Sequence, residues 1–252
     1  MPLLYKYLSF TENTESAVVT PRLWFSRPRR LNDPFELRPW YEFNYEPHQL
    51  VEQFARYLRR TNRSMTEHTA VAEATAIFLQ GRHRKPEMWN SLRLDISQKM
   101  DNEVGVLCFS TVVDSILMWS HYCSDHQGIC LGFEWTARTP FFGKAQQVRY
   151  RRKLPTVDVY NTPYKKQIEQ IFLTKFLDWK YENEWRVIDH DEGEGLREYP
   201  VELLRSITFG VNTSHEQRTD VRRWLKNRRS EVDLYQCHRD EQEFKLVIST
   251  AQ

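Results

Sequence analysis

The sequence predicts an α+β fold, in which a mixed, largely antiparallel β-sheet forms the core and helices flank it. Short apolar runs rich in β-branched and aromatic residues recur along the chain without alternating regularly with helices. A stretch at about residues 47–100 has helical periodicity instead, which indicates a helical insertion. Of the 252 residues, 40% are hydrophobic and 28% are charged, so the chain can bury a substantial core. We therefore expect one α+β domain over residues 1–252.

The expected strands lie on both sides of the helical stretch. Each is an apolar, β-prone run, and some are bounded by turn residues such as the Asn-Asp-Pro that follows the second run. In chain order they are "LLYKYLSF" (3–10), "RLWFSRP" (22–28), "VGVLCFS" (104–110), "GICLGFEW" (128–135), "QQVRYR" (146–151), "YENEWRVID" (181–189), "SITFGV" (206–211), "VDLYQCH" (232–238) and "FKLVIST" (244–250).

Apolar residues at helical spacing predict three helices in the stretch at 47–100, which forms either an insertion or a lid over the sheet. The three groups are Leu50, Phe54, Tyr57 and Leu58, then Val71, Ala74, Ile77 and Phe78, then Trp89, Leu92 and Ile96. Further along, we expect a short helix within residues 111–127, an amphipathic helix over 163–179 and a basic helix over 214–229.

The net charge, the cysteines and the lack of long apolar runs indicate which partners and which cellular compartment to expect. The formal net charge is +2, so no global basic field indicates nucleic acid or an anionic membrane as the partner. The four cysteines form no Cys-x-x-Cys pair, which favours buried, reduced thiols. The N-terminus has no cleavage-site pattern, and no run approaches the ~18–20 apolar residues of a membrane span. We expect a soluble, cytoplasmic protein that is not embedded in a membrane.

A histidine-rich segment, "MWSHYCSDHQG" (118–128), could in principle bind a metal. His121, Asp125 and His126 lie close in sequence, and residues at i and i+4 share one face of a helix. A third ligand is missing, because Cys123 would point to another face, so we predict no metal site. The segment still places His, Tyr, Ser and Asp just before Gly128, where the backbone could approach a ligand.

Two basic clusters could contact phosphate groups or could be solvated surface. "FSRPRR" supplies Arg27, Arg29 and Arg30 immediately before "LNDPFE", whose Asn-Asp-Pro suits a turn for structural reasons alone. The basic helix at 214–229 could contact a nucleic acid or protein acceptor. On that helix the candidate contacts are Arg222, Arg223 and Lys226.

Several common catalytic signatures are missing from the sequence. There is neither a GxxxxGK[ST] loop nor a GxGxxG loop to cradle phosphates. GxSxG and HExxH are absent too, which removes the α/β-hydrolase nucleophile elbow and the commonest zinc-protease motif. The most distinctive acidic feature is instead the pair Glu182 and Glu184, placed beside the apolar residues of the strand expected at 181–189.

Six blocks of the sequence together resemble a bacterial family called domain of unknown function 2971. They follow the order of the family and extend from residue 4 to residue 211. The combination of NDPFE, CFS, MWSHY and E-x-EWR is specific to it. The blocks are "LYKYLS", "LWFSRPRRLNDPFE", "VLCFSTVVDSILMWSHYCSDHQGICLGFE", "VRY", "KFLDWKYENEWRVI" and "ITFG".

The arrangement is also similar, more distantly, to ADP-ribosyltransferase-like folds, which implies NAD as the cofactor. By this resemblance Glu184 holds a ribose hydroxyl and stabilises the ribosyl cation, and Tyr122 stacks on nicotinamide. Secondary contacts to NAD would come from Tyr5, Lys6, Asn32, Ser110, Thr111 and His121. The first strand departs from the family pattern, since it carries "YKY" where those folds have His or Arg.

Three functions follow from these residues. The first is an enzyme that uses NAD, either for ADP-ribosyl transfer to a protein or nucleic acid or for NAD hydrolysis, and family analogy alone adds a defence or toxin role. In that reaction a fixed carboxylate in a dry pocket stabilises positive charge that develops on the ribose. The second is a nuclease whose Mg²⁺ is bound by Asp33, Glu36, Glu182 and Glu184. The third is a binding module that senses a nucleotide without chemistry.

Overall fold

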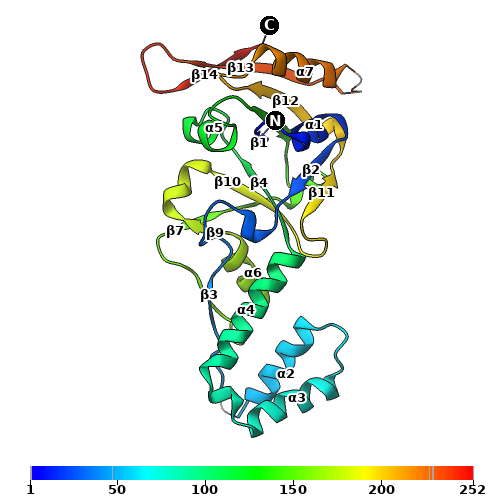
Figure 1. The fold of residues 1–252 in the computed structure, drawn as a ribbon, viewed down its shortest axis with the longest axis vertical. Coiled ribbons are helices and arrows are strands. Elements are labelled where there is room, and N and C mark those ends of the chain that lie inside the picture. The colour runs from blue at the N-terminus through cyan, green and yellow to red at the C-terminus, as the bar shows by residue number, and fades with distance from the viewer. Residues whose placement is uncertain (1, 47, 227, 229, 252) are drawn as a thin grey trace.

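The computed structural model describes residues 2–46, 48–226, 228 and 230–251. Within these residues an eight-stranded sheet runs through the molecule, with helices beside it (Figure 1). Strands β12 and β13 pair in parallel, whereas the other neighbours in the sheet are antiparallel. In spatial order the strands are β14 (Leu246–Thr250), β13 (Asp233–Arg239), β12 (Leu204–Phe209), β5 (Ile129–Glu134), β1 (Leu3–Leu8), β4 (Gly105–Ser110), β10 (Glu184–Asp189) and β6 (Gln146–Gln147). The predicted α+β class with a mixed, mostly antiparallel sheet is confirmed.

Three small ribbons accompany the large sheet. Strand β2 (Arg22–Phe25) pairs antiparallel with β11 (Gly195–Glu198). The other two ribbons are parallel, and they are β3 (Trp40–Glu42) with β8 (Thr156–Asp158) and β7 (Arg149–Arg151) with β9 (Thr174–Phe176).

The three helices predicted for residues 47–100 are present and form an arm at one end of the molecule (Figure 1). They are α2 (Leu50–Thr61), α3 (Glu67–Leu79) and α4 (Pro86–Glu103). Pro86 starts α4 at the first helical position, where its missing N–H costs nothing. Helix α4 leads directly into β4, so the arm connects to the middle of the sheet. At the opposite end of the molecule lie β12, β13, β14 and α7 (His215–Leu225).

Successive side chains of the central strands point to opposite faces of the sheet, and each face carries its own apolar cluster. On β1, Leu4 belongs to one cluster and Tyr7 to the other; on β5, Leu131 and Cys130 divide in the same way. The first face is covered by α1 (Glu12–Val19) and α7, and the second by α5 (Ile116–Tyr122). A third cluster joins the helical arm to α6 (Tyr164–Phe172). This division follows from the two-residue period of side chains along a strand.

The helix predicted over residues 163–179 is too long. Helix α6 ends at Phe172, and the chain continues as β9 and then as the 3₁₀ helix η4 (Leu177–Glu182). The change occurs because residues 174–176 pair with β7, which turns Lys175 into the interior. Tertiary contacts thus override the amphipathic pattern.

Two predicted strands are also revised. The strand expected over residues 181–189 begins only at Glu184, because residues 177–182 form the 3₁₀ helix. The strand expected over 146–151 is divided at Val148: β6 pairs with β10, while β7 pairs with β9. Val148 is buried at the point where the chain leaves the large sheet and enters the β7–β9 ribbon.

No helix in the described ranges is both long and apolar enough to cross a membrane. The four cysteines are unpaired, and Cys123, Cys130 and Cys237 are buried, as expected for reduced thiols.

Candidate functional site

Three adjacent strands bring predicted site residues into one row. Ser110, at the end of β4, is paired across the sheet with Tyr5 on β1 and with Glu184 at the start of β10. Residues directly opposite each other on neighbouring strands project toward the same face. The sheet therefore assembles residues from three distant parts of the sequence.

Glu182 and Glu184 both point toward Lys175. Between them Asn183 adopts a left-handed backbone conformation, with φ 44° and ψ 51°, where η4 ends; asparagine tolerates this conformation better than most residues. Lys175 Nζ lies 2.5 Å from Glu182 Oε2 and 3.0 Å from Glu184 Oε2. All three side chains are buried, so the turn at Asn183 aims two carboxylates at one buried ammonium group.

Arg186 binds the same carboxylate from another direction. Its Nε donates to Glu184 Oε1 over 2.7 Å, its Nη2 to Glu184 Oε2 over 3.0 Å, and its Nη1 to the Phe172 carbonyl oxygen over 2.9 Å. Arg186 also forms an ion pair with Glu36, whose Oε1 lies 3.6 Å from Lys175 Nζ. We call the five residues Glu36, Lys175, Glu182, Glu184 and Arg186 the charge cluster. Its three carboxylates share two cations in the interior, where an unpaired charge would be costly.

Tyr122 is tied to the charge cluster through its hydroxyl group. The hydroxyl donates to Glu182 Oε1 over 2.6 Å and accepts from Asn32 Nδ2 over 2.8 Å. These two bonds fix the direction of the hydroxyl and hence the orientation of the ring. The aromatic residue from α5 and the carboxylates from η4 and β10 therefore belong to one hydrogen-bonded unit.

Two further hydroxyl groups hold the backbone around the carboxylates. Ser110 Oγ donates to the Glu182 carbonyl oxygen over 2.6 Å and accepts from the Val112 N–H over 3.1 Å. The Tyr150 hydroxyl accepts from the Glu184 N–H over 2.8 Å. Both bonds lock the start of β10 and so limit the freedom of Glu184.

The charge cluster opens onto a cavity of about 230 Å³. Six of the eight predicted site residues line this cavity, together with Glu36, Lys175 and Glu182. The six are Tyr5, Lys6, Asn32, Ser110, Tyr122 and Glu184. Residues 47–100 contribute nothing to its described lining, and whether the helical arm is an insertion or a lid over the sheet stays a prediction.

The other two predicted residues lie outside the cavity wall. Thr111 is exposed and donates its backbone N–H to the Asn183 carbonyl oxygen over 3.3 Å. His121 is exposed too, and its ring lies 6.4 Å from that of Trp179 and 6.3 Å from that of Tyr181, measured between centroids. Successive residues of a helix point in directions about 100° apart, so His121 and Tyr122 project differently although their ring centroids are 6.5 Å apart.

Burial and charge act in opposite directions on the pKa values of the charge cluster. Burial raises the pKa of Glu184, and the nearby Glu182 adds to this, while Lys175 opposes it. Burial alone would lower the pKa of Lys175, but the carboxylates of Glu184 and Glu182 outweigh it and raise that pKa. Burial lowers the pKa of Arg186 to about 9, partly offset by Asp33, so this guanidinium remains charged at neutral pH. Burial and then Glu182 raise the pKa of Tyr122, which keeps the phenol protonated.

The acidic residues that a Mg²⁺ site would need are already paired. Glu36, Glu182 and Glu184 do converge, but their oxygens face Lys175 and Arg186. Asp33 accepts the Phe35 N–H over 2.9 Å in a local turn. Among the residues that the structure describes, no group of three or more His, Cys, Asp or Glu is arranged to bind a metal ion.

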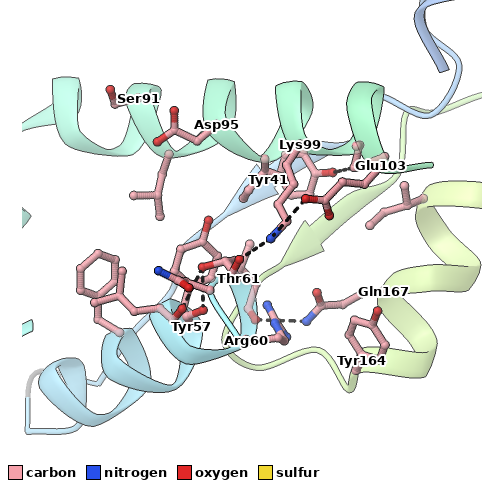
Figure 2. Close-up of a pocket in the computed structure, with 18 of the residues that line it drawn as sticks. Tyr41, Tyr57, Arg60, Thr61, Ser91, Asp95, Lys99, Glu103, Tyr164 and Gln167 are labelled. Atoms are coloured by element: carbon pink, nitrogen blue, oxygen red, sulfur yellow. Dashed lines mark hydrogen bonds and ion pairs between the residues drawn. The ribbon is translucent and has the colours of Figure 1, made fainter. Parts of the chain in front are cut away.

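A larger cleft of about 1170 Å³ lies between α2, α4 and α6, and it contains none of the predicted site residues. Figure 2 shows polar side chains from these helices around it. Lys99 on α4 donates to the Thr61 carbonyl oxygen at the end of α2. Gln167 on α6 donates to the Val159 carbonyl oxygen over 3.1 Å and to the Thr162 carbonyl oxygen over 2.7 Å. The Lys99 bond therefore ties α4 to α2 within the arm, and the Gln167 bonds fix the chain just before α6. Between the arm and α6, the Arg60 guanidinium on α2 lies 5.7 Å from the centroid of the Tyr164 ring.

The basic helix predicted at 214–229 is shorter in the structure, where α7 ends at Leu225 and lies at the far end of the molecule from the helical arm (Figure 1). Residues 227 and 229 of the prediction lie outside the described residues. Ser214 starts the helix with a capping box to Gln217. Arg223 pairs with Asp220 over 2.7 Å, and the Arg222 guanidinium lies 5.9 Å from the centroid of the Phe209 ring. A contact of Arg222, Arg223 and Lys226 with an acceptor stays a prediction.

Sequence reasoning missed Lys175, Tyr150 and Arg186 as members of the site. For Arg186 a signal was present, because Glu184 and Arg186 are two apart in a strand and so share one face. Lys175 gave no such signal, since its neighbours have the periodicity of a helix. Tyr150 lies in a predicted strand whose division at Val148 could not be foreseen.

Comparison with known proteins gives one match. The family described as "Protein of unknown function (DUF2971)" matches residues 118–187. The matched segment contains Tyr122, Lys175, Glu182, Glu184 and Arg186. Curated proteins and solved structures gave no match, and similarity to ADP-ribosyltransferase-like folds stays a prediction. The predicted resemblance to the DUF2971 family is confirmed over residues 118–187, the part of the chain that supplies most of the charge cluster.

Proposed function

We propose that the cavity beside Glu184 binds the nicotinamide–ribose end of NAD and that the protein cleaves the bond between nicotinamide and ribose. The observation that supports this proposal is the unit of Tyr122, Glu182 and Glu184, joined through hydrogen bonds and Lys175, at the wall of a small cavity. Ligand pockets usually measure about 300–1,000 Å³. A cavity of about 230 Å³ suits one ring and its sugar, with the remainder of the dinucleotide outside.

The charge of the cluster suits this reaction. Three carboxylates face two cations, which leaves a net charge of −1 on the cluster while all five groups are ionised. Nicotinamide leaves with the electron pair of the broken bond, which places positive charge on the ribose until a water molecule or an acceptor nucleophile bonds to that carbon. A fixed negative charge in a water-poor site stabilises this positive charge more strongly than water does. Because Arg186 and Lys175 hold both oxygens of Glu184, the carboxylate needs no reorientation during the reaction.

Each residue then has a distinct role. Glu184 and Glu182 supply the negative field, and Arg186 and Lys175 position them. The ring of Tyr122, held by its hydroxyl bonds, stacks on nicotinamide. Lys6 lines the same cavity, and no ion pair of its ammonium group exists among the described residues. That cation is available to a hydroxyl or phosphate oxygen of the cofactor.

Release of nicotinamide from NAD by the purified protein is the direct test. We expect release by the wild type and a loss of about 100-fold or more in Glu184→Gln, which is the usual effect of removing one electrostatic contact to a transition state. Glu198→Gln is a matched control, because that carboxylate is 72% exposed and pairs with Arg22 on β2. Release that survives Glu184→Gln in a folded variant would remove Glu184 from the mechanism.

A second candidate, nucleotide binding without turnover, is favoured by the saturation of the Glu184 oxygens by Arg186 and Lys175. It predicts thermal stabilisation by NAD with no nicotinamide released. A ligand at about 100 times its Kd stabilises the folded state by about 2.7 kcal/mol, which a melting curve resolves. Stabilisation together with release supports the enzyme instead.

A further inference from the structure

A second cavity, of about 270 Å³, lies on the other side of the charge cluster. Glu36 and Lys175 line both cavities, so they form part of a shared wall. The second cavity is bounded by residues 33–38, by the connection from β7 to β8 at residues 151–155, and by the ends of α6 and β9. Nothing in the NAD proposal uses this cavity.

Apolar side chains line this cavity, some of them buried and others exposed around its opening. Leu37 and Ile171 are buried at the floor, whereas Phe35, Leu154 and Phe176 are 68%, 45% and 42% exposed. One exposed apolar residue needs no explanation, because folded proteins carry many. Three of them around one cavity form a patch, and such patches mark binding sites.

Four cations surround the apolar patch: Arg38, Arg151, Arg152 and Lys153. Within the described chain none of the four forms an ion pair, and the side-chain bond of Arg151 goes to the Tyr150 carbonyl oxygen over 3.4 Å. The neighbouring Arg149 differs, since it pairs with Glu169 over 3.2 Å. The two acids that line the cavity are engaged elsewhere: Asp33 accepts the Phe35 N–H, and Glu36 belongs to the charge cluster.

We propose that this cavity and its rim bind single-stranded nucleic acid, with one base in the cavity and the adjacent phosphates on the four cations. Base stacking on exposed aromatic rings combined with a cationic track is the usual way in which proteins bind single strands. A single free phosphate ion would not need four cations. Successive phosphates along a nucleic acid strand would each contact one or more of them. An acidic peptide would satisfy the cations but would leave the apolar patch without a planar partner.

Fluorescence anisotropy with a labelled 12-nucleotide single strand, as RNA and as DNA, tests this site. For single strands the slope of log K against log salt is about −0.7 per phosphate contact, so four contacts predict about −3. We expect the double variant Arg152→Ala/Lys153→Ala to weaken binding and to reduce the magnitude of this slope by about 1.4. Phe35→Ala should weaken binding by about 5- to 150-fold through lost stacking; its ring is exposed, so the fold tolerates the change.

The control variant is Arg84→Ala/Lys85→Ala, an exposed Arg-Lys pair between α3 and α4, which removes the same charge in the helical arm (Figure 1). Equal weakening by both double variants would show general charge attraction and overturn the site. AMP competing at the same concentration as the strand, or a duplex of the same sequence binding as tightly, would also overturn it. Nicotinamide release should be the same in Arg152→Ala/Lys153→Ala as in the wild type, so failure of the NAD proposal is separable from failure of this one.

Discussion

Arg186 donates two hydrogen bonds to the Glu184 carboxylate, one to each oxygen, from a position two residues further along the same strand. Paired strand neighbours of this kind face the same side of a sheet, so the planar guanidinium meets the planar carboxylate edge to edge. Both side chains are almost completely buried. The Arg186–Glu184 pair therefore has a fixed geometry, and the other three residues of the charge cluster are arranged around it.

Removing Arg186 should destabilise the protein strongly. In Arg186→Met, Glu184 and Glu36 lose their shared partner, and an unpaired buried charge typically costs about 3–5 kcal/mol. Arg186→Lys should fall between this variant and the wild type, because lysine keeps the charge but cannot form the two-pronged contact. Urea unfolding measures the free energy of unfolding of all three.

The comparison variant for Arg186→Met is Arg22→Met. Arg22 pairs with Glu198 at the surface over 2.7 Å, and exposed pairs contribute about 0–1 kcal/mol. If both variants lost the same small amount, the buried pair would have no special structural role.

Two substitutions at Tyr122 separate its ring from its hydroxyl. Tyr122→Phe keeps the ring but removes the donor to Glu182 and the acceptor for Asn32, so it should lower the nicotinamide release rate while NAD still raises the melting temperature. Tyr122→Leu removes the ring and should abolish that thermal shift as well. An unchanged thermal shift in Tyr122→Leu would show that NAD does not stack on this residue.

The helical arm could be predicted because its signal is local. Leu50, Phe54 and Tyr57 fall on one face of α2 and are buried there, so the periodicity of the sequence and the contacts of the fold agree. The same holds for the central strands, where apolar runs such as residues 105–110 became β4.

The charge cluster could be predicted only in part, because its geometry depends on pairings between distant segments. Glu184, Tyr122 and Asn32 were expected near one ligand, and they line one cavity. Lys175 was expected on a helix, but the pairing of β9 with β7 turned it inward. No local pattern records that pairing. The sequence therefore could not predict that Lys175 is a partner of Glu184, whereas the two-residue spacing of Glu184 and Arg186 did carry a signal for their contact.

The pH dependence of nicotinamide release should report the environment of Glu184. Burial raises the pKa of this carboxyl group above its usual value of 4.5, with Lys175 acting in the opposite direction. The reaction needs the ionised form, so activity should rise with pH through that raised pKa and fall below it. A rate profile of kcat against pH should place the acid limb above pH 4.5; a limb at or below 4.5 contradicts the assignment.

Acid stability should depend measurably on Asp189, at the end of β10. Burial alone would raise the pKa of this carboxyl group, but the N–H groups of Asp191 and Glu192, together with Arg197, hold it below 3.8. The unfolded chain therefore binds the proton first as pH falls. The stabilising contribution is present above about pH 3.8 and is lost as pH decreases through the folded-state pKa.

Asp189→Asn should thus lower the free energy of unfolding at pH 7 by about 1 kcal/mol, since the group is partly solvated and its bonds weaken without disappearing. The difference from the wild type should shrink between pH 4 and pH 2. Urea unfolding at pH 7, 5 and 3 gives the three values, with the exposed Glu231→Gln as a reference for general charge effects. A difference for Asp189→Asn that stays constant from pH 7 to pH 3 would show that the ionisation of Asp189 is not what anchors this turn. The loop between β10 and β11 would then be held by Arg197 through its bonds to the backbone, such as the one from Nη2 to the Gly193 carbonyl oxygen over 3.1 Å.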